Sequence, residues 1–313
     1  MKIHYSMEDL GSISNPVVTT GTFDGVHAGH HVIINRLIQR AREIGGESVL
    51  ITFHPHPRRV LYPDAQGKNL LLINSQEEKK ELLSKTGLDH LIILEFTRQF
   101  AATSCSEFVE EYLVGRLHAK IIVVGFNHYF GKNKRGDFEY LYRLQEKYSF
   151  RVEEIPHHDI QNETVSSTKI RSALTEGNIQ RANAYLEHHY RIMAVLFAND
   201  EDHEQTGKEV YDAHIDERIK LIPADGIYAV SVHTGKRTLK ALYLVEDVGV
   251  ENNQLASTLK MKVVPLEQTD GLDRLKVTVC FHKRIGSPPG SRDNIRERQV
   301  LETGLRDIQE LIY

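Results

Sequence analysis

The chain has 313 residues, of which 40% are hydrophobic and 26% charged, so its composition is that of an ordinary globular protein long enough for two domains. The formal net charge of -4 provides no general basic field, and no apolar run approaches the roughly 18 residues that span a bilayer, so we expect neither a nucleic-acid nor a membrane partner. Because the two cysteines, Cys105 and Cys280, lack C-x-x-C spacing and no signal peptide is apparent, we expect reduced thiols and a cytoplasmic location.

The first half of the chain alternates short apolar runs with amphipathic stretches. Strands are predicted over residues 16–21, 47–53, 90–96, 119–125 and 150–155. Helices are predicted over residues 30–45, 75–87, 105–117 and 137–149. Such alternation indicates an α/β domain whose parallel sheet is covered on both faces. Ligands of these sheets bind beyond the carboxyl ends of the strands, where Gly21, Phe53, Pro55 and Gly125 fall.

After about residue 186 the pattern changes to β-rich runs separated by polar turns. Strands are predicted over residues 191–199, 225–233, 236–245, 257–267 and 275–285. These runs predict an antiparallel barrel or sandwich, closed by a C-terminal helix over residues 292–313. We therefore predict two domains, residues 1–186 and residues 187–313.

The stretch "TTGTFDGVHAGHH" joins the first long strand to the first helix. Gly21 and Gly25 allow a tight turn and the close approach of an anion, and the helix that follows offers N–H groups and a positive dipole end. His27 and His30 are three residues apart, so one helical turn presents both imidazoles on the same side. Each imidazole can donate a hydrogen bond to a phosphate oxygen near neutral pH.

Three histidines so close in sequence also allow a metal site or a pair of surface side chains. No Cys, Asp or Glu lies at ligand spacing beside the pair except Asp24, which we expect to tie the turn. The context of strand, glycine turn and helix favours phosphate, with Gly29 small so that a phosphate or a base can lie over the turn. His31 is expected to point away from the pair.

A second polar cluster, "VSSTKIRSAL", places hydroxyls where another helix is predicted to begin. Ser166, Ser167 and Thr168 are followed by the cations Lys169 and Arg171. One interpretation is an ordinary N-cap. The other is a cradle for the phosphate tail of a nucleotide, which combines hydroxyls, a helix N-terminus and an arginine.

Two further stretches follow strand ends. In "ITFHPHP", His54 and His56 share one face at strand spacing and could form a metal pair, whereas Pro55 and Pro57 favour a stiff loop with an apolar wall for a planar ring. In "VVGFNHYFG", Asn127 is placed to line a site. The aromatic residues Tyr129 and Phe130 follow it, and the charges after them are expected to be solvated.

The stretches "GTFDGVHAGHH", "ITFHPHPRRVL", "VVGFNHYFG" and "VSSTKIRSAL" occur in the order found in bacterial bifunctional riboflavin kinase/FAD synthetases, so residues 15–186 resemble the N-terminal domain of that family. The resemblance implies a Rossmann-like nucleotidyltransferase that transfers AMP from ATP to FMN, giving FAD and pyrophosphate. It implies catalytic roles for His27, His30 and Arg171. It implies ATP binding by Gly21, Phe23, Asp24, Gly29, Ser166, Ser167 and Thr168. It implies flavin binding by Phe53, Pro55, Pro57, Asn127 and Phe130. It also implies Mg²⁺, which is expected to be held mainly by phosphates and water.

The second half resembles the riboflavin kinase barrel of the same family less closely. "LIPADGIYAVSV" matches a strand entry of that barrel, but the kinase motif G-R-x-x-G-x-P-T-A-N is missing: Gly207 is the one glycine between Tyr190 and Leu221. The family's catalytic glutamate aligns near Lys262. We therefore predict that the barrel fold is kept and that riboflavin kinase activity is weak or absent.

Four functions are compatible with these patterns. The leading one is an FMN adenylyltransferase with a degenerate kinase domain, and the second is the full bifunctional enzyme, which would also take riboflavin. A non-enzymatic flavin or nucleotide sensor is the third. The fourth is an adenylyltransferase for another phosphorylated acceptor, because the acceptor is identified by resemblance. The sequence does not specify an oligomeric state.

Overall fold

The computed structural model describes residues 1–8, 10–63, 69–156, 159–160, 163–247, 259–267, 269 and 271–287. The chain forms two compact units. The first consists of Met1–Leu71 and Lys79–Val165, and the second of Leu72–Glu78 and the described residues from Ser166 onward. The second unit therefore includes a short segment that comes from the first half of the sequence.

The first unit is built on a six-stranded sheet in the order β1-β4-β3-β2-β5-β6, and every pairing is parallel. Its strands are β1 (Lys2–His4), β2 (Val17–Thr20), β3 (Ser48–His54), β4 (His90–Glu95), β5 (Ile121–Gly125) and β6 (Arg151–Ile155). The chain continues from β2 to one side of the sheet and from β5 to the other. The carboxyl ends of β2 and β5 therefore mark a topological switch point, where ligands of open α/β sheets bind.

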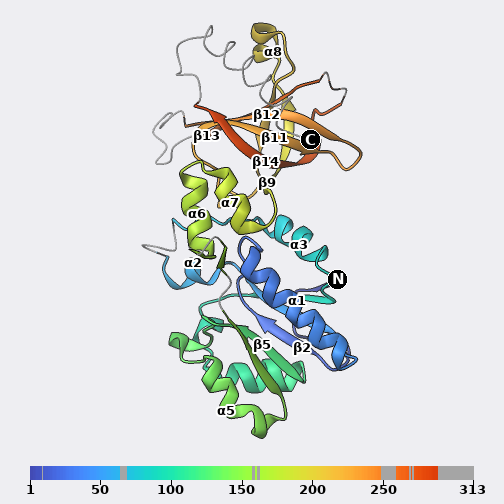
Figure 1. The fold of residues 1–313 in the computed structure, drawn as a ribbon, viewed down its shortest axis with the longest axis vertical. Helices are drawn as coiled ribbons and strands as arrows, with labels where there is room; N and C mark the ends of the chain where they lie inside the picture. The colour runs from blue at the N-terminus through green and yellow to red at the C-terminus, as the bar shows by residue number, and fades with distance from the viewer. Residues whose placement is uncertain are drawn as a thin grey trace. The chain divides into compact units, whose positions relative to one another are not determined.

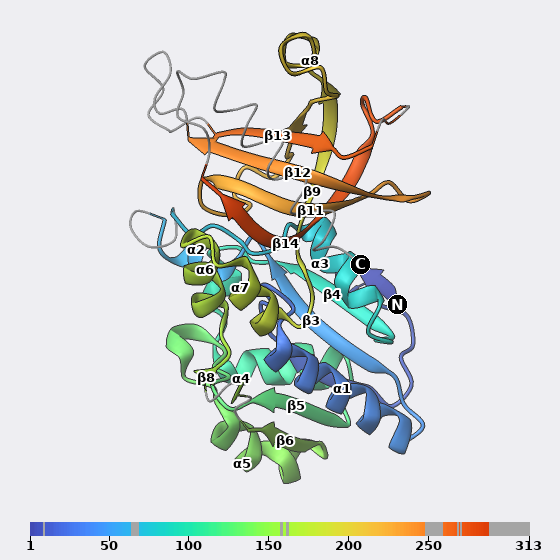
Figure 2. The same ribbon diagram turned by 45° about the horizontal axis from the view of Figure 1, so that its top comes forward.

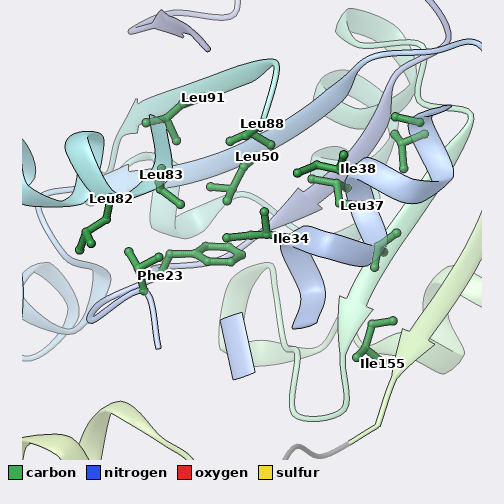
Figure 3. Close-up of a cluster of buried hydrophobic side chains, with 14 of the residues drawn as sticks. Phe23, Ile34, Leu37, Ile38, Leu50, Leu82, Leu83, Leu88, Leu91 and Ile155 are labelled. Carbon is green, nitrogen blue, oxygen red and sulfur yellow. The ribbon is translucent and has the colours of Figure 1, made fainter. Parts of the chain in front are cut away.

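Helices cover both faces of this sheet. The helical segments are α1 (Ala28–Glu43), α2 (Pro57–Leu61), α3 (Gln76–Ser84), η1 (Phe100–Ala102), α4 (Cys105–Glu107), η2 (Phe108–Arg116), η3 (Lys132–Lys134) and α5 (Phe138–Tyr148). The buried residues of α1 pack with alternate strand residues such as Leu50 and Leu91 on one face, and Figure 3 shows this cluster around Ile34 and Leu37. The intervening strand residues, such as Val49 and Ile51, pack on the other face with the helices that follow β4 and β5. Alternation with a period of two thus distributes the apolar side chains between two cores.

The predicted α/β architecture is confirmed, and the differences are local. β1 has three residues, too few for a hydrophobic pattern to show, and pairs with β4. The helix predicted over 105–117 is α-helical over Cys105–Glu107 and π-helical over Phe108–Arg116. A short hairpin of β7 (Asp159–Ile160) and β8 (Glu163–Thr164) follows the sheet. Cys105 and Cys280 are both thiols.

The second unit is a closed antiparallel barrel in the strand order β10-β13-β12-β11-β14-β9 (Figures 1 and 2). Its strands are β9 (Tyr190–Ala198), β10 (Tyr211–His214), β11 (Gly226–His233), β12 (Thr238–Asp247), β13 (Leu259–Pro265) and β14 (Lys276–Gly286). Aromatic rings fill part of the interior, where Tyr190, Tyr228 and Tyr243 surround the Phe281 ring at centroid distances of 5.6, 5.5 and 5.0 Å. The structure thus resolves the predicted choice between barrel and sandwich. The helix predicted over 292–313 lies outside the described residues.

Among its described residues, the barrel unit has three helices: α6 (Ser167–Thr175), α7 (Ile179–Leu186) and α8 (Asp200–Thr206). Asn183 of α7 donates to the backbone carbonyl of Phe281 at 2.8 Å and accepts from the backbone N–H of Tyr190 at 2.7 Å. These two bonds attach the α6–α7 pair to strands β14 and β9. The "VSSTKIR" helix is therefore held by the barrel.

A buried ion pair anchors the segment Leu72–Glu78 in the same unit. Glu78 forms a capping box with Ser75, and its carboxylate also lies 2.7 Å from the ammonium of Lys220. Both side chains are almost fully buried, at 1% and 0% exposure. Lys220 donates in addition to the backbone carbonyls of Ile73 and Arg191. The cost of burying both charges is thus offset by several polar contacts.

Candidate functional site

The turn between β2 and α1 has an unusual backbone. Phe23, Gly25 and Val26 have positive φ angles of 47°, 96° and 43°. The left-handed region is uncommon for residues other than glycine and is a clear outlier for a β-branched residue such as Val26. Strain of this kind persists where the surrounding structure holds it, often at functional sites. Here the Phe23 side chain is buried beside Ile34 in the core (Figure 3), and this packing holds the turn in place.

His27 and His30 lie together at the start of α1. His27 is the N-cap residue, and its ring stacks on that of His30 with a centroid distance of 3.6 Å and an interplanar angle of 16°. The Phe23 ring lies 4.7 Å from the His30 ring. The three-residue spacing therefore presents both imidazoles on one side of the helix start, as predicted. His31 belongs to the first turn of α1 and is half-buried.

The environment of His30 determines its protonation state. Burial, followed by the nearby His27, Lys79 and His31, lowers the pKa of His30 well below its usual value. The backbone N–H of His27 donates to Nδ1 of His30 at 3.3 Å. Because Nδ1 accepts this bond, the proton of the neutral ring lies on Nε2. Without a ligand, His30 is thus a neutral ring with an Nε2–H donor.

The other residues predicted for this turn lie close by in the chain, and their roles in binding stay predictions. Asp24 is buried at 1% exposure, and the Gly21 N–H donates to the carbonyl of Ile51 at 3.0 Å. A Cβ added to Gly29 would lie 3.4 Å from Cε1 and Nδ1 of the His27 ring. Phe23 is 2% exposed, and its ring lies in the core of the first unit.

Lys79 is a residue of this site that sequence reasoning missed. Its ammonium donates to the carbonyl of Thr22 at 2.8 Å, within the turn, and its side chain is 3% exposed. The signal was present in the sequence, because Lys79 precedes the apolar residues Leu82 and Leu83 by three and four positions. This spacing places it on the buried face of α3.

Two other groups of predicted residues follow β3 and β5. The Phe53 side chain is half-buried against the core, Pro55 is exposed and follows a cis peptide bond, and Pro57 begins α2. The Nδ1 of His56 accepts the backbone N–H of Arg58 at 3.2 Å and caps α2.

After β5, Asn127 is exposed, and the half-buried Phe130 ring packs near Phe108 and Tyr140. His128, which the sequence did not single out, lies 3.2 Å from the hydroxyl of Thr20 through its Nε2. Burial lowers the pKa of His128 to about 4. The ends of β2 and β5 are thus joined by a neutral histidine.

The hydroxyl cluster lies at the start of α6 in the barrel unit. Ser166 is the N-cap, and its hydroxyl accepts the backbone N–H of Lys169 at 3.3 Å. Ser167 and Arg171 are half-buried, and Thr168 is exposed. The N-cap interpretation thus holds for Ser166, while the first-turn residues Ser167, Thr168 and Arg171 stay predicted ligands of a phosphate tail.

Lys262, near which the resemblance places the family's catalytic glutamate, forms an ion pair in the barrel unit. Lys262 lies on β13 and pairs with Asp202 of α8 at 2.5 Å. The acidic helix α8 occupies the sequence between β9 and β10. The loss of riboflavin kinase activity stays a prediction.

In the described part of the chain, no group of three or more His, Cys, Asp or Glu side chains is arranged to hold a metal ion. None of the helices in those residues combines the length and the hydrophobicity that a bilayer crossing requires.

Comparison with known proteins connects this geometry to one family. The model of the FAD synthetase family matches residues 11–169. A bifunctional riboflavin kinase/FMN adenylyltransferase from Listeria monocytogenes is 33% identical over 224 residues, which cover 72% of this chain and 70% of that protein. The protein of the same name from Escherichia coli K12 is 30% identical over 270 residues, covering 86% and 84% of the two chains.

The fold is shared with a solved structure. The crystal structure of a macrolide-efflux protein from Streptococcus pneumoniae superposes with a TM-score of 0.87, at 24% identity, and covers 100% of this chain and 99% of that chain. At this identity the likeness establishes the fold alone. The family match over half the chain and the relatives at 30% and 33% identity together show that the chain belongs to the FAD synthetase family.

Proposed function

We propose that this protein is an FMN adenylyltransferase, which makes FAD and pyrophosphate from FMN and ATP. The observation that carries the proposal is the His27–His30 pair, stacked at 3.6 Å at the start of a 16-residue helix behind a strained turn. Such an arrangement offers imidazole donors and a helix dipole to an anion at the topological switch point of the sheet. The relatives named FMN adenylyltransferases support this assignment.

The reaction is a displacement at phosphorus. An oxygen of the FMN phosphate attacks the α-phosphorus of ATP in line, so that a new O–P bond forms. The bond from the α-phosphorus to the oxygen that bridges to the β-phosphorus breaks, and pyrophosphate leaves with that electron pair. No covalent enzyme intermediate is needed, so catalysis consists of positioning and of stabilising negative charge.

His30 is prepared for such a role before ATP binds. Its Nδ1 accepts the His27 N–H, so its Nε2–H is directed away from that contact and can donate to a phosphate oxygen. A neutral ring loses less hydration free energy than a charged one when a ligand encloses it. The arriving phosphate charge then favours the protonated ring, which strengthens the bond as charge develops on the leaving pyrophosphate.

The remaining roles follow the family pattern. Ser167, Thr168 and Arg171 would hold the phosphate tail, with Ser166 fixing the helix start by its cap. The loop of Phe53, Pro55 and Pro57 and the residues Asn127 and Phe130 would line the flavin and nucleotide sites. Mg²⁺ bound to the ATP phosphates would neutralise charge and prefers phosphate oxygens and water as ligands.

We assign adenylyl transfer to residues 1–186 and a supporting role to residues 187–313. The ion pair of Lys262 with Asp202 supports weak or absent riboflavin kinase activity. The barrel retains a structural use, because Asn183 attaches the α6–α7 pair to it. We further propose that the enzyme acts in the cytoplasm on ATP and FMN, without a nucleic-acid partner.

The test supplies purified protein with Mg-ATP and either FMN or riboflavin, with products separated by chromatography. FAD from FMN but no FMN from riboflavin is expected. FMN from riboflavin would identify the full bifunctional enzyme, and binding of FMN and ATP without any FAD would identify a sensor. His30→Ala should abolish FAD formation, whereas the matched variant His31→Ala should retain most of it. Activity in His30→Ala would remove the assignment of the site.

A further inference from the structure

Lys79 is a buried cation that contacts the turn before the histidine pair. It lies in α3 at 3% exposure, on the same helical face as Leu82 and Leu83, which belong to the core of the first unit. Lysine is among the residues that are rarely buried fully unless they are paired, because removing an ammonium group from water is costly. A shorter apolar residue would complete this helix face without that cost.

The ammonium of Lys79 acts on the turn that precedes the histidine pair. It donates to the carbonyl oxygen of Thr22 at 2.8 Å, and the hydroxyl of Thr52 donates to the same oxygen at 3.2 Å. This carbonyl belongs to the peptide that joins Thr22 to Phe23, the first residue with a positive φ. Two donors from different elements therefore fix the orientation of the peptide at which the strained turn begins.

The charge of Lys79 also reaches the histidine pair. Lys79 is one of the groups that lower the pKa of His30, after burial and His27. A neutral His30 supplies a hydrogen-bond donor but no charge, whereas the phosphate chain of ATP carries several negative charges. A cation held behind the pair in a poorly solvated setting attracts such a chain strongly, because the interaction is screened little.

We propose that Lys79 is a positioning residue for nucleotide binding, which fixes the phosphate turn through the Thr22 carbonyl and supplies its buried positive charge. The proposal rests on the proposed function, since it concerns the same site. It assigns two separable contributions to one side chain. The hydrogen bond sets the path of the turn, and the charge raises the affinity for phosphate.

Three substitutions separate these contributions. Lys79→Gln keeps an N–H donor and removes the charge, Lys79→Met removes both, and Lys79→Arg keeps the charge. Lys80→Gln is the matched control, because Lys80 is the next residue of the same helix and is half-buried. Thermal denaturation shows which variants are folded, and Lys79→Gln decides the outcome if Lys79→Met does not fold.

Two measurements on the full chain test the proposal without requiring any turnover. Calorimetry gives the Kd for Mg-ATP in the absence of flavin. NMR of histidine-labelled protein follows the titration of His30, whose signal is assigned as the one that the His30→Gln variant lacks. Lys79→Gln should raise the Kd about tenfold, as expected for the loss of one charge-assisted contact. It should also move the His30 titration to higher pH. Lys79→Arg and Lys80→Gln should both have a Kd for Mg-ATP and a His30 titration close to those of the wild-type protein.

Three results would overturn the proposal. One is wild-type affinity for Mg-ATP in folded Lys79→Gln, the second is an unmoved His30 titration in that variant, and the third is an equal loss in Lys79→Arg and Lys79→Met, which would indicate packing rather than charge. A wild-type protein that makes no FAD would contradict the proposed function alone, because neither readout depends on FAD.

Discussion

Replacing Gly29 by alanine adds one methyl group at the centre of the H-x-G-H motif. In the structure the added Cβ would lie 3.4 Å from Cε1 and Nδ1 of His27, which is an ordinary van der Waals distance. Apart from chain neighbours and the helix backbone, no other heavy atom of the described residues lies within 4 Å. Gly29 has no positive φ and is in the first turn of α1. The folded protein should therefore accept the methyl group.

The expected effects on stability and activity have opposite signs. Alanine is favoured over glycine within a helix by up to about 1 kcal/mol, so the free energy of unfolding should be unchanged or slightly higher. The methyl group would occupy space beside the His27 ring, which the proposed phosphates need. A displacement of reacting groups by about 1 Å can cost on the order of a hundredfold in rate, which corresponds to about 2.7 kcal/mol of activation free energy.

The assay compares kcat/KM for FAD formation with the midpoint of thermal unfolding. Asn35→Ala is the matched control, because Asn35 is exposed on the same helix and its replacement also raises helix propensity. The control should keep full activity. Gly29→Ala protein with kcat/KM within threefold of wild type would show that the space is not used by ATP. A large fall in its unfolding midpoint would show that the fold, rather than the ligand, requires the glycine.

Two further predictions concern stability. Lys220→Met leaves the buried Glu78 carboxylate without its cation and should lower the free energy of unfolding by about 3–5 kcal/mol. Urea titrations followed by circular dichroism measure this loss, and a loss below about 1 kcal/mol would contradict the stabilising role of the ion pair. Burial lowers the pKa of His30 well below normal and that of His128 and His282 to about 4, so the unfolded chain binds more protons than the folded one below the usual histidine pKa. The free energy of unfolding should therefore be constant above about pH 6.5 and fall as the pH drops towards 4. A urea midpoint that does not change over this range would contradict the lowered histidine pKa values.

Much of the fold could be predicted because its signals are local. Continuous apolar strands with helices between them predicted a parallel sheet, and the structure has one. The pairing of strands is not local, so the choice between barrel and sandwich needed the structure. The ion pair of Glu78 with Lys220 joins residues far apart in the chain and gives no sequence signal of its own.

The candidate site shows the same division. The spacing of His27 and His30 predicted that their rings would lie on one side of the helix start, and the rings do stack there. Their hydrogen bonding, and with it the position of the proton on His30, depends on atomic geometry that spacing does not contain. The spacing of Lys79 to Leu82 and Leu83 indicates its burial, but its contact with Thr22 spans 57 residues of sequence and gives no local signal. His128 was missed because its contact with Thr20 spans 108 residues.

Transfer of AMP from ATP to FMN can be followed with isotopically labelled ATP. FMN is incubated with the protein and Mg-ATP labelled at either the α- or the γ-phosphorus, and the products are separated. We expect the α-label in FAD and the γ-label in pyrophosphate, in equal amounts. Absence of α-label from FAD, or γ-label recovered as inorganic phosphate or in a flavin, would contradict the transfer of AMP.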